Sequence, residues 1–279
     1  MSESSRNAPP GAERVQPPEL THLRLELPAP GVALLVLDQP ALRNAMSDEM
    51  TASWVRAVDH LAADPTVRVV VVTGEGSAFC SGGNTSWLAG EPGATVDRLR
   101  SKMLPFYRSW LTIRKLEVPT IAAINGPAIG AGLSLALACD IRYAARGARM
   151  GVPFVKLGLH AGMATTYLLP DVVGRAAARD LLLTGRLVDA DEALGLGLVS
   201  RVLEPDVFLD EVLRTAAEVA ATAPVASRLT KTALLSGHAD LEAGLAWEGL
   251  AQPVTMATAD LQEGIRAVQE KRAPEFRGR

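Results

Sequence analysis

Residues 118–139 read VPTIAAINGPAIGAGLSLALAC and carry no charged side chain. Such a stretch is long enough to cross a bilayer, which takes about 20 apolar residues. Its middle, however, is turn chemistry, because residues 125–127 read Asn-Gly-Pro and are followed by Gly130 and Gly132. A turn exposed to lipid would leave backbone groups without hydrogen-bond partners. The stretch is therefore predicted to form a buried strand, a sharp turn and a buried helix, and no membrane partner is expected.

A second buried strand precedes this one in the chain. Residues 67–73 read VRVVVVT, and a nearly continuous run of β-branched residues is typical of a strand that is covered on both faces. This strand runs into a turn with glycines between Gly74 and Gly83, as the strand at 118–124 runs into Gly126 to Gly132. Helix-forming sequence follows each turn. The repeat of strand, glycine turn and helix is the main organisational feature of the chain.

The rest of the chain divides into three parts. Residues 1–19 are rich in Ser, Pro, Glu and Gly and are predicted to be a disordered N-terminal tail. Residues 20–204 are predicted to be an α/β core that begins with a β-hairpin at 21–38 and a helix capped by Ser47 or Asp48. Residues 205–279 are predicted to be a C-terminal helical region, because strand signals disappear and no heptad pattern of a coiled coil is sustained. Its helices are expected at 208–221, 225–235, 241–250 and 261–271.

Composition excludes several classes of function. The chain has 279 residues, 48% of them hydrophobic and 21% charged, so it can bury a large core. A net charge of −3 without a basic cluster argues against a nucleic-acid partner. The only two cysteines, Cys80 and Cys139, have no zinc-ligand spacing and suit a reducing cytoplasm. No metal site is predicted, and the glycine segments match neither a dinucleotide fingerprint nor a phosphate-binding loop.

The two glycine turns have a chemical interpretation. Adjacent glycines at Gly82 and Gly83 let an anionic oxygen approach backbone N–H groups, and a helix that starts near Gly130 presents free N–H groups and a positive dipole end. Two such donors at one point would form an oxyanion hole, which suits a thioester carbonyl that becomes an enolate. The alternative is that these glycines only shape turns.

The motifs resemble those of the crotonase superfamily, which includes enoyl-CoA hydratases and enoyl-CoA isomerases. The resemblance runs from about Leu23 to Arg279. It is carried by Pro40 with Arg43-Asn44-Ala45, residues 78–84 (AFCSGGN), residues 125–140, the LTGR turn at 183–186 with Ala193, residues 197–199 (GLV) and residues 270–276 (EKRAPEF).

The resemblance implies a fold, a substrate and an assembly. The implied fold is a crotonase-like spiral of ββα repeats with a C-terminal helical region, assembled as homotrimers or dimers of trimers. The implied substrate is an acyl-CoA thioester, so coenzyme A enters as part of the substrate and no cofactor is bound permanently. By position, the backbone N–H groups of Gly83 and Ala131 would form the oxyanion hole.

The catalytic positions depart from the family pattern. The two glutamates of the hydratases correspond by position to Ser134 and Phe154 in this chain. A phenylalanine cannot move a proton, and a serine hydroxyl is not basic near neutral pH. The sequence therefore argues against hydration by two glutamates. His160 is a candidate acid or base, with a structural hydrogen-bonding role as the alternative. Ser134 is a candidate for orienting water or a substrate carboxylate, with the filling of a helix face as the alternative.

Binding residues follow from the same resemblance. Arg43 is the best candidate for pairing with the phosphates of coenzyme A, and Lys271 is a weaker one. Ordinary core packing is the alternative for each aromatic or aliphatic pocket residue. The predicted coenzyme A contacts are Arg43, Ala45, Ser81, Asn84 and Lys271, and the predicted acyl pocket is Trp87, Leu88, Phe106, Gly130, Pro153 and Phe154.

Three functions are compatible with the sequence. The first is an acyl-CoA enzyme of the enoyl-CoA hydratase/isomerase type that stabilises a thioester enolate in a backbone oxyanion hole. The second is decarboxylation of a carboxyacyl-CoA, which generates an enolate without a general base. The third is a protein that binds acyl-CoA without turnover.

Overall fold

The computed structural model describes residues 18–83 and 92–279, so the predicted tail lies almost entirely outside the described residues. A six-stranded sheet forms its centre, with the strand order β1-β2-β3-β4-β6-β9. Only β1 and β2 pair antiparallel, as the predicted hairpin, and the remaining neighbours are parallel. The strands are β1 Leu23–Ala29, β2 Val32–Leu37, β3 Val69–Gly74, β4 Thr120–Ile124, β6 Ile141–Ala145 and β9 Arg201–Leu203.

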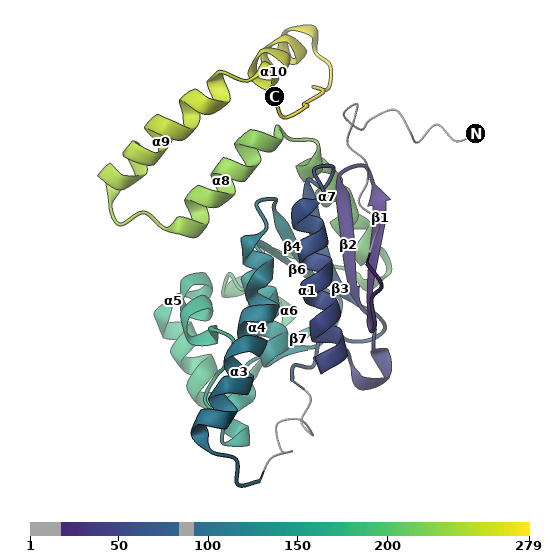
Figure 1. The fold of residues 1–279 in the computed structure, drawn as a ribbon, viewed down its shortest axis with the longest axis vertical. Coiled ribbons are helices and arrows are strands. Elements are labelled where there is room, and N and C mark those ends of the chain that lie inside the picture. The colour runs from purple at the N-terminus through teal and green to yellow at the C-terminus, as the bar shows by residue number, and fades with distance from the viewer. Residues whose placement is uncertain (1–17, 84–91) are drawn as a thin grey trace, which may run out of the picture.

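Helices cover both faces of this sheet (Figure 1). Helices α1 (Asp48–Ala63) and α3 (Val96–Trp110) lie over one face, and α7 (Phe208–Ala220) packs on the other. Every residue of β2, β3 and β4 is buried, which explains why the sequence runs are continuously apolar instead of alternating. Helix α1 begins where it was predicted, because the Ser47 side chain accepts a hydrogen bond from the Met50 N–H.

A small second sheet and two isolated β-bridges lie beside the large sheet. They include residues of the two glycine turns. Strands β5 (Ala128–Ile129), β7 (Arg149–Gly151) and β8 (Leu187–Asp189) form a small sheet. Isolated bridges join Met46 to Gly83 and Cys80 to Ala128. Successive turns of the chain thus stack their backbones on one another, as the predicted repeat requires.

Residues 118–139 fold as predicted, with one refinement. Strand β4 ends at Ile124, and α4 (Ala131–Ala138) starts inside the predicted glycine turn. All of α4 is buried, so its sequence shows no amphipathic period. The remaining elements are α5 (Thr165–Thr184, interrupted at Gly174), α6 (Ala190–Gly195) and the short 3-10 helices η2 (Pro40–Leu42), η3 (Leu111–Lys115), η4 (Pro153–Leu157) and η5 (Pro205–Val207).

The last three helices form an arm, α8 (Pro224–Ser236), α9 (Leu241–Met256) and α10 (Ala259–Glu270), that extends from the core (Figure 1). The predicted end of α9 at residue 250 is wrong. The helix continues to Met256 and includes Pro253, which lacks the N–H for one of its backbone hydrogen bonds. Among the described residues, no helix is long and apolar enough to span a bilayer.

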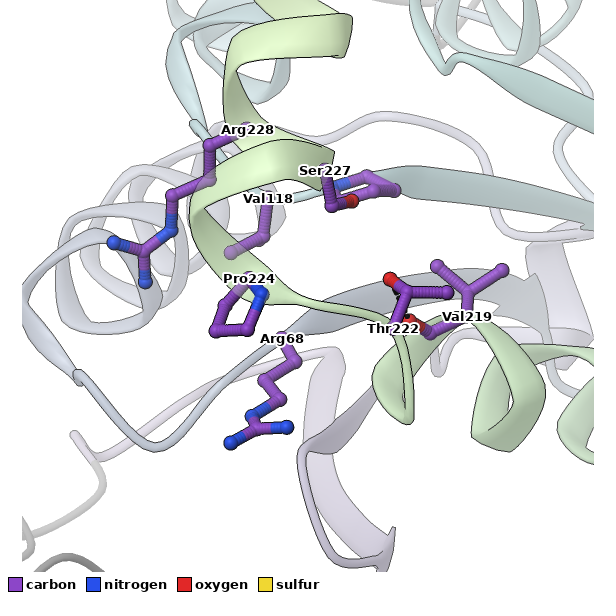
Figure 2. A pocket seen from close by; sticks show the side chains of 8 residues that line it. Arg68, Val118, Val219, Thr222, Pro224, Ser227 and Arg228 are labelled. Atoms are coloured by element: carbon purple, nitrogen blue, oxygen red, sulfur yellow. Dashed lines mark hydrogen bonds between the residues drawn. The ribbon is translucent and has the colours of Figure 1, made fainter. Parts of the chain in front are cut away.

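The arm meets the core at the junction drawn in Figure 2. There Pro224 and Arg228 of α8 face Arg68 and Val118 of the core across a small cleft. The Arg68 guanidinium donates to the Phe276 carbonyl oxygen at 2.8 Å, so the C-terminal tail is tied to the start of β3. This hydrogen bond is one of those that connect the arm to the core.

Candidate active site

The loop after β3 is held against the segment that follows η2. Asn44 is fully buried, and its Nδ2 donates to the Ala78 carbonyl oxygen at 2.7 Å. The Ser81 N–H donates to the Arg43 carbonyl oxygen at 3.0 Å, and the Met46 N–H donates to that of Gly82 at 2.8 Å. These three bonds fix the register of residues 78–83.

The bond from Met46 also determines where the Gly83 N–H points. Gly82 C=O and Gly83 N–H belong to one peptide unit, and a trans peptide directs them to opposite sides. Because the Gly82 oxygen faces Met46, the Gly83 N–H faces away from it. This N–H makes no hydrogen bond to any residue within 18–83 or 92–279. Within those residues Gly83 is a donor without a partner, on the side away from Met46, and its role in an oxyanion hole stays a prediction.

The first turn of α4 supplies a second free donor. Gly130 has a φ of 58°, and its N–H donates to the Gly151 carbonyl oxygen at 2.8 Å. The Gly130 carbonyl oxygen accepts from the Ser134 N–H at 3.1 Å. The Ala131 N–H, in the same peptide as that oxygen, therefore points backwards out of the helix, where the macrodipole favours negative charge.

The two donors belong to segments whose backbones are in contact. A Cβ added to Gly82 would lie 2.7 Å from the Ile129 carbonyl oxygen and 3.3 Å from the Ala131 nitrogen. A Cβ on Gly132 would lie 2.1 Å from the Cys80 carbonyl oxygen. Only glycine allows this approach. The geometry thus places the loop that carries Gly83 directly beside the start of α4.

Ser134 is buried below this point. Its Oγ donates to the Gly130 oxygen at 3.1 Å and lies 2.5 Å from the Thr165 Oγ1, which itself donates to the Gly162 carbonyl oxygen. Ser134 is 0% exposed and has protein partners for its hydroxyl. This arrangement favours a positioning role that ties α4 to the start of α5. Thr165 was not found from the sequence, since no motif marked it.

Phe154 and His160 differ in how they lie relative to α4. The Phe154 ring comes within 3.5 Å of the place a Gly130 Cβ would occupy, so an apolar ring borders the start of α4. Pro153 begins the same 3-10 helix. His160 is exposed, and its Nδ1 lies 2.8 Å from the adjacent Ala161 carbonyl oxygen. That contact suits the structural alternative for His160.

Tyr107 is a site candidate that the sequence analysis missed. Its Oη would lie 2.6 Å from a Cβ on Gly162, so the phenol packs directly on that glycine. Phe106, the predicted pocket residue, is buried on the same helix and meets Trp110 edge to face. The sequence does contain a signal for this residue: residues 103, 106, 107 and 110 have helical spacing, which places an apolar stripe on one face of α3.

The predicted coenzyme A contacts are spread over two regions. Arg43 is exposed and Ala45 is buried, and both lie beside residues 78–83. The Ser81 Oγ donates to the Leu42 carbonyl oxygen at 3.3 Å. Lys271 ends α10 in the arm instead of the core. Three other predicted residues lie outside the described residues: the coenzyme A contact Asn84 and the acyl-pocket residues Trp87 and Leu88.

Nucleophilic and metal chemistry gain no support from the described residues. Burial raises the pKa of the Cys80 thiol to about 12, so it stays protonated at neutral pH. Within the parts of the chain that the structure covers, no three His, Cys, Asp or Glu side chains gather as metal ligands. The distinctive chemistry of the site is its pair of free backbone donors.

Comparison with known proteins identifies the family. The model of the enoyl-CoA hydratase/isomerase family matches residues 29–279. The (E)-benzylidenesuccinyl-CoA hydratase of Thauera aromatica is 38% identical over 88% of this chain and 96% of its own, and the 2,3-dehydroadipyl-CoA hydratase of Escherichia coli is 36% identical over 89% and 96%. The crystal structure of an enoyl-CoA hydratase from Bacillus anthracis superposes with a TM-score of 0.87 at 31% identity, covering 93% of this chain and 100% of the other. The chain has the crotonase fold and belongs to the enoyl-CoA hydratase/isomerase family, which acts on acyl-CoA thioesters.

Proposed function

We propose that this enzyme stabilises the enolate of an acyl-CoA thioester between the N–H groups of Gly83 and Ala131. The observation that carries the proposal is the pair of anchored peptides: Met46 holds the Gly82 oxygen and Ser134 holds the Gly130 oxygen. Both N–H groups are thereby directed away from those anchors before any substrate binds. Preorganised donors of this kind stabilise a developing oxyanion by about 3 kcal/mol each.

The test deletes each donor without deleting a bond that the fold uses. Gly83→Pro and Ala131→Pro remove an N–H, and proline is well accepted at the first position of a helix. Turnover is expected to fall by about 10²- to 10³-fold. The matched controls Gly83→Ala and Ala131→Gly keep the N–H, and a Cβ on Gly83 meets no atom within 4 Å. Equal activity in the proline and control variants, all shown to be folded, would refute the oxyanion hole.

The reaction is best sought by mass spectrometry with enoyl-CoAs, carboxyacyl-CoAs and saturated acyl-CoAs. Addition of water to an enoyl-CoA would identify a hydratase that works without glutamates at positions 134 and 154. Thermal stabilisation by these esters without any mass change or chromatographic shift would instead identify a binding protein. Isomerisation leaves the mass unchanged, so it is read from the chromatographic shift of the product.

Decarboxylation is the second candidate, and the surroundings of α4 favour it. The hydroxyl of Ser134 has protein partners and Phe154 presents an apolar ring, so neither side chain supplies a base. Loss of carbon dioxide needs none. The bond between the carboxylate and the α-carbon breaks, its electron pair becomes the enolate, and a proton from solvent later fills the α-carbon. No release of carbon dioxide from malonyl-type thioesters would count against this reaction.

We also propose that the acyl group carries a second carboxylate. The two relatives described above are named for benzylidenesuccinyl-CoA and 2,3-dehydroadipyl-CoA, both thioesters of dicarboxylic acids. The decarboxylation candidate needs such a substrate too. A preference for carboxylated over neutral acyl-CoAs of equal chain length is the expected result. We propose a cytoplasmic location, supported by the two buried free thiols.

The assembly is proposed to be a homotrimer or a dimer of trimers. Large apolar side chains of the arm are exposed in the single chain: Leu250 is 73% exposed and Val268 79%. Light scattering is expected to give about three or six times the mass of one chain. Leu250→Glu should lower that mass, whereas Val96→Glu, which changes an 82% exposed residue of the core, should not. A wild-type monomer would contradict the proposal.

A further inference from the structure

Tyr107 carries a hydroxyl that rests on Gly162 and has no hydrogen-bond partner within residues 18–83 and 92–279. The residue lies on α3 and is half-buried, and its ring packs against the main core cluster. Its Oη makes no hydrogen bond with any residue in the parts of the chain that the structure covers. The half-buried phenol is not among the fully buried polar atoms, so its hydroxyl stays open to water and is available to a ligand.

The phenol is held in one place. Its ring edge rests on Gly162, where an added Cβ would meet Oη at 2.6 Å and Cζ at 2.8 Å. On the other side, the Phe106 ring lies at 6.1 Å between centroids, in an edge-to-face arrangement. A hydroxyl on a rigid aromatic ring loses little freedom when it binds a ligand.

A chain of contacts connects Tyr107 with the oxyanion donors. Gly162, on which the phenol rests, accepts the hydroxyl of Thr165, and Thr165 contacts Ser134. Ser134 in turn bonds to the carbonyl oxygen of Gly130, next to Ala131. Tyr107 is therefore connected through packed residues to the start of α4, which carries one of the two proposed donors.

Tyr107 is suited to donate a hydrogen bond. Desolvation raises the pKa of its phenol above the ordinary value, so the O–H stays protonated at neutral pH. A phenol O–H that meets a carboxylate forms a short, charge-assisted hydrogen bond, which is about twice as strong as a bond between neutral groups.

We propose that Tyr107 is a specificity-determining residue that donates a hydrogen bond to a second carboxylate on the acyl group of the substrate. The inference rests on the proposed function, since it names the group that recognises the carboxylated acyl chain suggested there. Tyr107 binds and orients the substrate and takes no part in the transfer of a proton.

Binding of unreactive saturated esters tests this role without any need for turnover. Calorimetry is run with pairs of equal carbon number: succinyl-CoA and butanoyl-CoA, glutaryl-CoA and pentanoyl-CoA, adipyl-CoA and hexanoyl-CoA. In Tyr107→Phe, the affinity for the carboxylated ester of the best pair should fall about tenfold relative to its neutral counterpart, as loss of a hydrogen bond to a charged group predicts. The pair with the largest change reports the distance from the thioester to Tyr107.

Two further variants separate recognition from packing. In Gly162→Ala the new methyl group would come within 2.6 Å of the Oη and displace it, so this variant should reproduce the selective loss while it keeps the tyrosine. Tyr167→Phe removes a hydroxyl from a tyrosine that is 69% exposed and should leave the affinities for both esters unchanged. An equal loss for both members of every pair in Tyr107→Phe, or no loss in any pair, would overturn the proposal.

The outcomes also distinguish this proposal from the oxyanion hole. A selective change in affinity with Tyr107→Phe, in a protein that turns over no acyl-CoA, would support the recognition of the carboxylate and refute the enolate chemistry. Turnover that depends on the Gly83 and Ala131 N–H groups, with no preference for carboxylated esters, would support the oxyanion hole and refute the role of Tyr107.

Discussion

Helix α4 in the core and helix α9 in the arm are both rich in alanine and leucine, yet their surroundings differ completely. All eight residues of α4 are buried, whereas α9 has no buried residue. Helix α4 is inserted between stacked backbones, and α9 lies on the outside of an arm that meets the core through a few bonds. Amino-acid composition alone therefore does not determine whether a helix is buried. The segments that pack around the helix determine it.

The largest expected difference comes from a matched pair of glycines within these two helices. Gly132→Ala would bring a Cβ within 2.1 Å of the Cys80 carbonyl oxygen, so we expect the free energy of unfolding to fall by about 3 kcal/mol or more. Gly249→Ala meets no atom within 4 Å and should raise it by about 0.5–1 kcal/mol, because alanine is the better helix former. Urea denaturation measures both. Equal changes in the free energy of unfolding for the two variants would show that α4 and α9 do not differ in packing.

The bond between arm and core provides the next test. Lys231, only 7% exposed, donates to the Val118 carbonyl oxygen at 2.8 Å and pairs with the Asp140 carboxylate at 2.8 Å. Lys231→Met should cost about 2 kcal/mol, since the carboxylate keeps its bonds to Thr120 and is not left without partners.

Limited proteolysis should locate that loss in the arm. Cleavage of Lys231→Met within residues 224–279 is expected to speed up while the core fragment persists. Arg146→Met is the control, because its pairs with Asp191 and Glu204 are exposed and should contribute less than about 1 kcal/mol. Uniform cleavage across the chain would show that Lys231 supports the core and not the junction.

The core and the arm also differ in how much of them could be predicted. The strands at 67–73 and 118–124 were predicted within about two residues, because a buried parallel strand must be apolar on both faces. The two glycine turns suggested backbone donors at these places, and the resemblance to the family assigned them to Gly83 and Ala131. The end of α9 was missed, because an exposed helix has no packing pattern that marks where it stops.

The side chains around the donors were harder to predict. Ser134 was singled out, but its partner Thr165 is 31 residues away, and a contact of that separation leaves no local signal. The spacing on α3 places Tyr107 on the apolar face of that helix, but its contact with Gly162 arises only when α3 packs beside the start of α5. Sequence patterns report periodicity within an element, and a site built from several elements depends on how they pack.

The closed character of the core predicts inert thiols. Burial raises the pKa of Cys80 and of Cys139 to about 12, and both side chains are inaccessible. Neither is expected to react with a thiol reagent at pH 8 in the native protein, and both should react in urea. Rapid modification of one thiol in the folded enzyme would show that the stacked turns open more readily than their packing implies.

The smallest expected effect lies in the tail beyond α10. The Arg272 guanidinium bonds to both oxygens of the Glu263 carboxylate, which also accepts the Glu275 N–H at 2.9 Å. These bonds, with Arg272 the larger cause, lower the pKa of Glu263 from 4.5 to about 2. A depressed pKa means that the bonds contribute stability above about pH 4.5, and that this contribution is lost as the pH falls towards 2.

Because the Glu263 side chain is only partly buried, at 19% exposed, solvent and salt still screen this contribution, and we expect a local release of the tail without unfolding of the core. Hydrogen exchange, corrected for intrinsic rates, should show the Glu275 amide losing protection between pH 4.5 and 2. Glu263→Gln should remove the protection of the Glu275 amide already at pH 7, whereas Glu275→Gln, whose ion pair with Arg277 is long at 3.7 Å, should leave it in place. Loss of protection in the strands of the core over the same pH range would mean that the tail is coupled to the sheet, and the separation between core and arm would then fail.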